Sequence, residues 1–321
     1  MKTPLLNVLS LLTLAATGIA SAQTYPTRTV RVVAASSPGG TSDILARLLA
    51  QKLAETFKQQ FVVENRAGAS GILGTDAVAK APPDGYTLLL IQPSLTINPS
   101  IFAKLPYDTL HDLAPVSNVV DVAQCISAHP SVPAKNVKEL IALAKAQPGV
   151  LLGGTPGSGT HPHLTAELFQ QMAGIRLQLV VYKGVSPAYI ALVSGEVGVM
   201  FSAVPSALPY YKSGKIRVLG VTTAKPLASL PGVPAITESA LPGFESSQWF
   251  GVLAPAATPR PIIDRLQQAI TRVSSNPEMQ EKLTGMGMTL INSTPEQFAA
   301  VIKSEMATWA KVIQAAGIKP Q

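Results

Sequence analysis

At Thr29-Val-Arg-Val-Val-Ala-Ala-Ser-Ser-Pro-Gly-Gly-Thr-Ser-Asp43, a strand-like apolar run is followed by a Gly-rich turn and by an apolar-periodic segment that continues to Phe57. The same pattern recurs at Val150-Leu-Leu-Gly-Gly-Thr-Pro-Gly-Ser-Gly-Thr160, before a second periodic segment that ends at Met172. Each copy predicts a strand, a tight turn and a helix N-terminus. Because the first turn of a helix has unpaired N–H groups and a partial positive charge, it attracts anions. Two copies predict two similar lobes that close on one small anion, which favours a binding protein over a catalyst.

The two periodic segments have the pattern of amphipathic helices. In the first, the leucines between residues 45 and 53 fall on one face, as a period of 3.6 residues requires. Thr41 or Ser42 is expected to cap this helix, and Thr160 is expected to cap the second. Asp43 suits the positive end of the first helix.

Apolar runs alternate with helical patterns over most of the chain. The strand candidates are residues 30–35, 61–64, 86–91, 116–128, 150–153, 177–182, 197–201, 216–222 and 249–254. The helix candidates are residues 42–57, 72–80, 137–146, 162–173, 187–194, 259–274, 277–286 and 295–316. Short strands rich in Val, Ile and Leu are typical of parallel strands covered on both faces, so the alternation predicts an α/β fold.

The apolar run at residues 116–128 is longer than an ordinary strand. We interpret it as a crossing from one lobe into the other, with residues 248–255 as the return crossing. The first lobe is then discontinuous and comprises residues 23–122 and 248–321. Residues 123–247 form the second lobe, in which the Pro-rich segment 225–244 is an irregular connector.

Residues 1–22 are predicted to be a cleaved signal peptide. Lys2 supplies a short positive start, residues 4–20 are uncharged and mostly apolar, and Ala20-Ser21-Ala22 fits the small-residue cleavage pattern. Export of the mature chain is therefore expected. Cys125 is the single cysteine, so no internal disulfide forms after export, and its apolar setting predicts a small buried residue in a strand.

The formal net charge of +7 comes from dispersed residues, with no run of five or more basic side chains. This distribution argues against nucleic-acid binding, and no nucleic-acid partner is predicted. A mild positive charge helps the protein collect small anions by long-range attraction.

Nucleotide binding and hydrolysis are weaker interpretations of the second Gly-rich loop. Gly154 and Gly159 have the spacing of a phosphate-binding P-loop, but Thr160 and His161 stand where Lys and then Ser or Thr are needed. Ser158 lies close to histidines, yet the members of a hydrolytic triad normally come from separate elements. We therefore predict no catalytic residue, and a hydrolase stands third among the possible functions.

His161 and His163 form a His-x-His pair that could ligate a metal. Only Glu167 is close in sequence as a further ligand, so helix capping or packing is the favoured role. No metal and no cofactor are predicted.

Short motifs that match one known family occur in order along the mature chain. They are Tyr25-Pro-x-Arg28, Pro38-Gly-Gly-Thr-x-Asp43, Val63-Glu-Asn-Arg66, Ala79-Lys-Ala-Pro-Pro-Asp-Gly-Tyr-Thr-Leu-Leu-Leu90, Leu105-Pro-Tyr-Asp108, His129-Pro-Ser-Val-Pro133, Tyr182-Lys-Gly184, Val199-Met-Phe201, Leu241-Pro-Gly-Phe244, Trp249-Phe-Gly251, Ala254-Pro255 and Ala315-Ala-Gly-Ile-Lys-Pro320. Together they closely resemble the Bug family, the solute-binding receptors of tripartite tricarboxylate transporters. The resemblance covers essentially all of the mature chain.

The resemblance implies a two-lobed periplasmic binding protein of type II architecture with the ligand cleft between its lobes. It implies export to the periplasm, capture of a small organic acid and a partnership with an inner-membrane permease, the receptor being a monomer and no enzyme. In the family a ligand carboxylate lies against two loops, which correspond here to residues 38–41 and 157–160. A ligand sensor that feeds a two-component system is the alternative function.

Several positions depart from the pattern of the resembled family. Ser36 and Ser37 replace a Phe-Ala pair, Val181 stands where many members have Pro, and Ser202 stands where many have Asp or Asn. Gln92-Pro-Ser94 replaces a loop rich in Ser and Thr. Because an ammonium group needs a carboxylate partner, Ser202 disfavours an amino acid as the ligand. The predicted ligand-binding residues are Ser36, Ser37, Gly39, Gly40, Thr41, Gln92, Ser94, Ser158, Gly159, Thr160, Tyr182 and Ser202.

Overall fold

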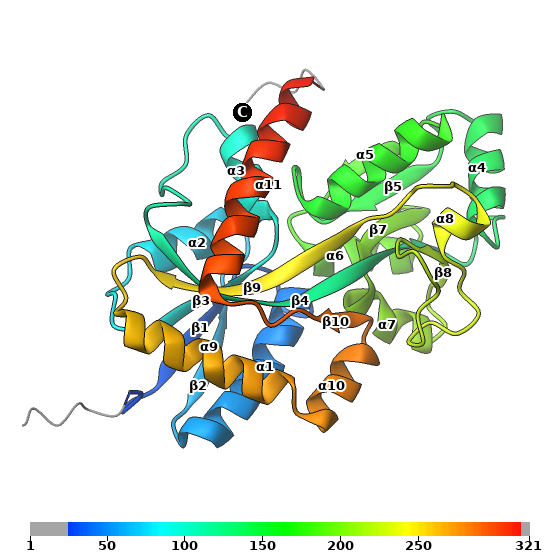
Figure 1. The fold of residues 1–321 in the computed structure, drawn as a ribbon. Helices are drawn as coiled ribbons and strands as arrows, with labels where there is room; N and C mark the ends of the chain where they lie inside the picture. The colour runs from blue at the N-terminus through cyan, green and yellow to red at the C-terminus, as the bar shows by residue number, and fades with distance from the viewer. Residues whose placement is uncertain (1–24, 316–321) are drawn as a thin grey trace, which may run out of the picture.

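Figure 1 shows the computed structural model of the protein, which describes residues 25–315. The predicted signal peptide lies outside the described residues. The strands are β1 (Val30–Ala34), β2 (Phe61–Asn65), β3 (Thr87–Ile91), β4 (Leu113–Ala128), β5 (Leu152–Thr155), β6 (Gln178–Val181), β7 (Val199–Ala203), β8 (Arg217–Val221), β9 (Ser247–Pro255) and β10 (Met288–Leu290). The helices are α1 (Thr41–Phe57), α2 (Ile72–Ala79), α3 (Ser94–Ile101), α4 (Val137–Ala146), α5 (His161–Ala173), α6 (Val185–Ser194), α7 (Val204–Lys212), α8 (Ile236–Ser239), α9 (Arg260–Ser274), α10 (Pro277–Thr284) and α11 (Pro295–Ala315), with a 3-10 turn η1 (Ala69–Gly71).

The elements form two lobes of the same design. Lobe 1 contains β1, β2 and β3, which are parallel, with β9 antiparallel to β3. Lobe 2 contains β5, β6 and β7, which are parallel, with β8 beside β4. The predicted α/β class and two-lobed architecture are confirmed.

Helices cover both faces of the sheet in each lobe. In lobe 1, apolar residues of α1, α9 and α10 pack on one face, and those of α2, α3 and α11 pack on the other. In lobe 2, α6 and α7 cover one face, while α4, α5 and α8 cover the other. Burial on both faces explains why the parallel strands are continuous apolar runs rather than alternating ones.

β4 and β9 connect the lobes and run side by side between them (Figure 1). The first part of β4, up to Ala123, pairs with β9, and its last part, from Gln124 to Ala128, pairs with β7 and β8. The long apolar run in the sequence therefore corresponds to a strand shared by both lobes. The residue limits predicted for the lobes stay predictions, because both strands continue without a break through the junction.

Three helices of the structure are missing from the sequence prediction. The short α8 lies inside segment 225–244, which was predicted to be an irregular connector. The other two are α3, which contains Pro99, and α7, which contains Pro209. Proline interrupts helical patterns, so both segments resemble loops in the sequence. No helix within residues 25–315 is long and apolar enough to cross a membrane.

Candidate functional site

A cavity of about 590 Å³ lies between the two lobes. Its lining comes mainly from segments at and after the carboxyl ends of β1, β2, β3, β5, β6 and β7, and from two residues of β9. In open α/β sheets, ligands bind outside the carboxyl ends of the strands. The fold thus places the cavity where this architecture builds its binding sites.

Hydrogen bonds from backbone amides of the loop after β1 hold that loop in its conformation. The Gly39 amide donates to the Asp43 carboxylate at 2.9 Å, and the Gly40 amide donates to the carbonyl of Ser37 at 3.1 Å. Burial acts to raise the pKa of Asp43, but the bonds from Gly39 and Arg47 outweigh it, so this pKa lies below its usual value. Asp43 therefore stays ionised, and the two glycine amides are already engaged.

The loop after β5 is closed in a similar way. The hydroxyl of Thr160 donates to the carbonyl of Gly157 at 2.7 Å, and the Gly159 amide donates to Nδ1 of His163 at 3.3 Å. Thr160 is the N-cap residue of α5 but makes no side-chain cap, and the N-cap of α1 is Gly40, also without a side-chain cap. The predicted capping by Thr41, Ser42 or Thr160 is wrong, because Thr41 and Ser42 lie inside α1 and the Thr160 hydroxyl binds its own loop.

Both helix N-termini nevertheless reach the cavity. Thr41 and Ser42, at the start of α1, line it from lobe 1, while Thr160 and Pro162, at the start of α5, line it from lobe 2. The backbone amides of a first helical turn have no acceptor within the helix. Two partial positive charges therefore converge on one space.

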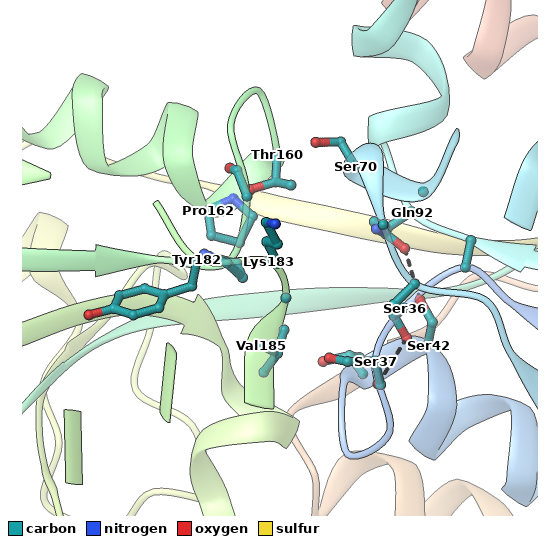
Figure 2. Close-up of a pocket in the computed structure, with 18 of the residues that line it drawn as sticks. Ser36, Ser37, Ser42, Ser70, Gln92, Thr160, Pro162, Tyr182, Lys183 and Val185 are labelled. Carbon is teal, nitrogen blue, oxygen red and sulfur yellow. Dashed lines mark hydrogen bonds between the residues drawn. The ribbon is translucent and has the colours of Figure 1, made fainter. Parts of the chain in front are cut away.

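Figure 2 shows residues of the two lobes that line the cavity from opposite sides. One group is Thr160, Pro162, Tyr182, Lys183 and Val185, and the other is Ser36, Ser37, Ser42, Ser70 and Gln92. The ring of Tyr182 points away from the opposite group, and its hydroxyl donates to Glu196 at 2.8 Å. Tyr182 thus lines the cavity without offering its hydroxyl to it.

The lobes are in direct contact around the cavity. Four hydrogen bonds cross the cleft. They run from Ser70 Oγ to the Ser158 carbonyl at 2.6 Å, between Thr41 Oγ1 and Ser206 Oγ at 3.1 Å, from Ser186 Oγ to the Pro38 carbonyl at 2.5 Å, and from the Ser186 amide to Ser37 Oγ at 3.5 Å. These contacts join residues of different lobes, so the structure represents a closed form of the protein.

The cavity wall carries little charge. Of the described residues that line it, Lys183 alone is charged, and none is a carboxylate. Phe102, Phe250, Val181 and Val185 supply apolar surface between the hydroxyl groups. This lining suits an anion with an apolar body, because a buried cation would lack a partner.

A model of the tripartite tricarboxylate transporter family receptor matches residues 45–318 of the chain. The chain belongs to this receptor family. The sequence resemblance to the Bug family is thereby confirmed.

This receptor is similar in sequence and in structure to several known proteins. It is 37% identical to Protein BugT of Bordetella pertussis (strain Tohama I) over 311 residues, covering 95% of each chain. It is 35% identical to the protein in the solved structure of R. palustris Rpa4515 with adipate. The TM-score is 0.89, and the match covers 92% of this chain and 100% of that one. The structure of the periplasmic binding protein BugD is 32% identical, with a TM-score of 0.87 and coverage of 92% and 100%.

The receptor brings most of the predicted site residues to the cavity. Eight of the twelve line it, namely Ser36, Ser37, Thr41, Gln92, Ser158, Thr160, Tyr182 and Ser202. Gly39, Gly40, Ser94 and Gly159 do not. The three glycines shape the loops behind the wall, and Ser94 is buried at the start of α3. The ligand-binding role of all twelve residues stays a prediction.

Several lining residues were absent from the sequence prediction. Ser70, Lys183, Ser206 and Gln248 all face the cavity. Lys183 lies inside the quoted Tyr-Lys-Gly motif, so a charge adjacent to Tyr182 was an available signal. Ser70 lies in the segment Gly68-Ala-Ser-Gly71 that follows β2, so a third Gly-rich turn was also an available signal. Ser206 and Gln248 follow no Gly-rich turn, and no local pattern marks them.

The rings of His161 and His163 both contact hydrogen-bonding groups of the protein. Nδ1 of His161 lies 2.5 Å from the Gln124 amide nitrogen, which also contacts Thr165 Oγ1 at 2.6 Å. Burial lowers the pKa of His161 to about 4 and also lowers that of His163. Within residues 25–315, no cluster of three or more His, Cys, Asp or Glu side chains could hold a metal ion.

Proposed function

We propose that this protein is a periplasmic receptor that captures a small organic carboxylate for the membrane permease of a tripartite transporter. The observation that carries the proposal is the convergence of two helix N-termini on one cavity without a carboxylate among its described lining residues. Membership of the receptor family and the adipate bound by a similar protein support the same ligand class.

Organic anions fit this cavity better than amino acids. First-turn amides and hydroxyl groups donate hydrogen bonds to carboxylate oxygens, and such charge-assisted bonds are the stronger kind. An α-ammonium group needs an acceptor with negative charge. Asp43 is close in sequence to the wall, but it is 5% exposed and paired with Arg47 at 2.9 Å. It is therefore not free to bind an ammonium group.

Lobe closure is the proposed mechanism. Only in the closed form do α1 and α5 both reach one ligand, so ligand binding favours closure. The hydrogen bonds that cross the cleft, such as Ser70 to Ser158, stabilise the same form. We further propose that residues 23–122 with 248–321 and residues 123–247 are the moving lobes, and that the permease recognises the closed monomer.

The ligand class predicts the outcome of a binding panel. Succinate, malate, adipate, citrate, benzoate and nicotinate are compared with aspartate and glutamate by thermal shift and calorimetry. We expect the largest stabilisation from an organic acid, about 2.7 kcal/mol at a hundred times its Kd. Binding of aspartate or glutamate alone would contradict the proposal.

The orientation of Tyr182 predicts a substitution without effect on binding. Because its hydroxyl donates to Glu196 outside the cavity, we expect Tyr182→Phe to bind the best acid of the panel within about twofold of wild type. Glu196→Gln serves as the matched control for the other end of the same bond. A fall in affinity beyond tenfold for Tyr182→Phe alone would show that this hydroxyl reaches the ligand.

A further inference from the structure

An apolar cluster at one side of the cleft contains residues of both lobes. Lobe 1 contributes residues of α3 and α11, which lie side by side (Figure 1), and lobe 2 contributes Leu164 of α5. Apart from Phe102, none of its members lines the cavity. This inter-lobe cluster consists of Ile97, Ile101, Phe102, Leu164, Trp309 and Ile313. It joins the lobes at a place that the ligand does not occupy.

The indole ring of Trp309 also meets the ring of His161. The ring centroids lie 6.3 Å apart, and the ring planes are perpendicular, at 90°. Edge-to-face ring pairs are favourable beyond the apolar area that they bury. Trp309 belongs to α11 of lobe 1, whereas His161 is the first residue of α5 in lobe 2. Trp309 therefore takes part in two contacts between the lobes, the inter-lobe cluster and this ring pair.

The ring of His161 is held where the lobes join. The amide nitrogen of Gln124 lies 2.5 Å from Nδ1 of His161, and it also donates to Ser246 Oγ at 3.2 Å. Gln124 is the residue at which β4 changes its pairing from β9 to β7, and Ser246 directly precedes β9. Both crossing strands therefore fix the His161 ring, while Trp309 moves with lobe 1. Opening of the cleft separates the two rings.

We infer that Trp309 is a positioning residue for ligand binding, which holds the lobes closed over the ligand without touching it. The inference rests on the proposed function. Phe102 connects the two regions, because it lines the cavity and also packs in the inter-lobe cluster. The ligand and the cluster favour the same closed form, so each strengthens the other. A weaker cluster lowers the population of the closed form and with it the apparent affinity.

The dissociation rate measures this role. The probe is whichever of succinate, malate, adipate, citrate, benzoate and nicotinate binds wild type most tightly. We expect Trp309→Ala to release the probe faster by roughly tenfold or more and to associate within about threefold of wild type, because changes in a complex act mainly on dissociation. Trp309→Phe keeps an aromatic ring and should release the probe within about threefold of wild type. Calorimetry gives the Kd, and surface plasmon resonance gives the two rates.

Neighbouring residues on the same two helices provide matched controls. Leu164→Ala removes the lobe 2 side of the inter-lobe cluster and should also raise the Kd. Leu168→Ala, one turn further along α5 at a position 39% exposed, should not. On α11, Met306 packs against the core of lobe 1 that contains Phe298 and Ile302. Met306→Ala should lower the melting temperature of the ligand-free protein and keep the wild-type Kd.

Tryptophan fluorescence gives a readout that a role in the folding of lobe 1 alone would not change. The sequence has two tryptophans, and Trp249 is 5% exposed in the core of lobe 1, whereas Trp309 is partly buried. We expect the probe acid to shift wild-type emission to shorter wavelength and to protect it from acrylamide, because closure covers the ring of Trp309. Trp309→Phe leaves Trp249 as the single tryptophan, and it should bind the probe without this response.

The outcomes separate the inference from the proposed function. Wild-type Kd and dissociation rate in Trp309→Ala, or in Leu164→Ala where the former does not fold, would overturn the role of Trp309 alone. An emission response that persists in Trp309→Phe, or an equal loss of affinity in Met306→Ala, would also overturn that role. Absence of saturable binding of all six acids to wild type would overturn the proposed function and this inference with it.

Discussion

Gly159→Ala is expected to weaken binding of the best organic acid by roughly tenfold or more, because it opposes the closed form. A Cβ atom at residue 159 would lie 2.6 Å from Cδ1 of Ile101. Gly159 belongs to the loop after β5 in lobe 2, whereas Ile101 ends α3 in lobe 1. The clash therefore acts between the lobes, and a protein that opens its cleft escapes it.

The backbone cost of this substitution is separable from the clash. Gly159 has φ +66°, a conformation that costs an alanine about 1 kcal/mol. Gly174 at the end of α5 has φ +60°, and a Cβ atom added there would meet no other atom within 4 Å. Gly174→Ala should therefore lose similar stability and retain full affinity, as measured by urea denaturation and calorimetry.

A second substitution checks that Ile101 is the residue with which the added methyl group clashes. Ile101→Val removes Cδ1, the atom closest to the new methyl group. We expect the double variant Gly159→Ala with Ile101→Val to recover most of the lost affinity, as coupling between neighbouring residues requires. Wild-type affinity in Gly159→Ala would mean that the closed form seen here is not the form that binds.

Titration of His161 is expected to lower the free energy of unfolding by about 3 kcal/mol as the pH falls from about 6.5 to about 4. Burial lowers its pKa to about 4 in the folded state, while the unfolded chain titrates near the ordinary value. The unfolded state therefore binds the proton first. This contribution is fully present above about pH 6.5, and acid removes it progressively down to about pH 4.

Urea denaturation at several pH values measures this loss. His161→Gln cannot titrate, so its unfolding free energy should fall less than that of wild type over the same interval. His111→Gln is the control, because the side chain of His111 is 82% exposed. Parallel curves for His161→Gln and wild type would contradict a buried neutral histidine.

The sequence predicted the elements whose signals are local. The first amphipathic pattern, residues 42–57, matches α1 to within one residue, because its apolar stripe and Gly-rich start lie within one segment. The long run at residues 116–128 indicated the crossing strand for a similar reason. Helices α3 and α7 were missed because Pro99 and Pro209 interrupt their patterns, although burial of their apolar faces stabilises both.

In the candidate site, too, the residues that were predicted are those with a local signal in the sequence. Ser36, Ser37 and Thr160 belong to the Gly-rich turns of the repeated strand–turn–helix pattern, and all three residues line the cavity. Gly39, Gly40 and Gly159 were predicted to bind the ligand, and the sequence does not show what their amides bind. Gly39 donates to Asp43 and Gly159 donates to His163, which leaves the amides of the first helical turns as the backbone donors without an acceptor in the helix.

By itself, the sequence determined that the chain has two strand–turn–helix units in an α/β fold, since hydrophobic periodicity and turn residues act over a few neighbouring positions. It also carried the motifs of the receptor family. Only the tertiary structure decided which side chains meet at the cavity. Ser70 reaches Ser158 across 88 positions of sequence, and Gln248 comes to the wall because β9 pairs with β4. Such contacts depend on how distant strands pair and how the lobes close, and no local pattern of residues records either.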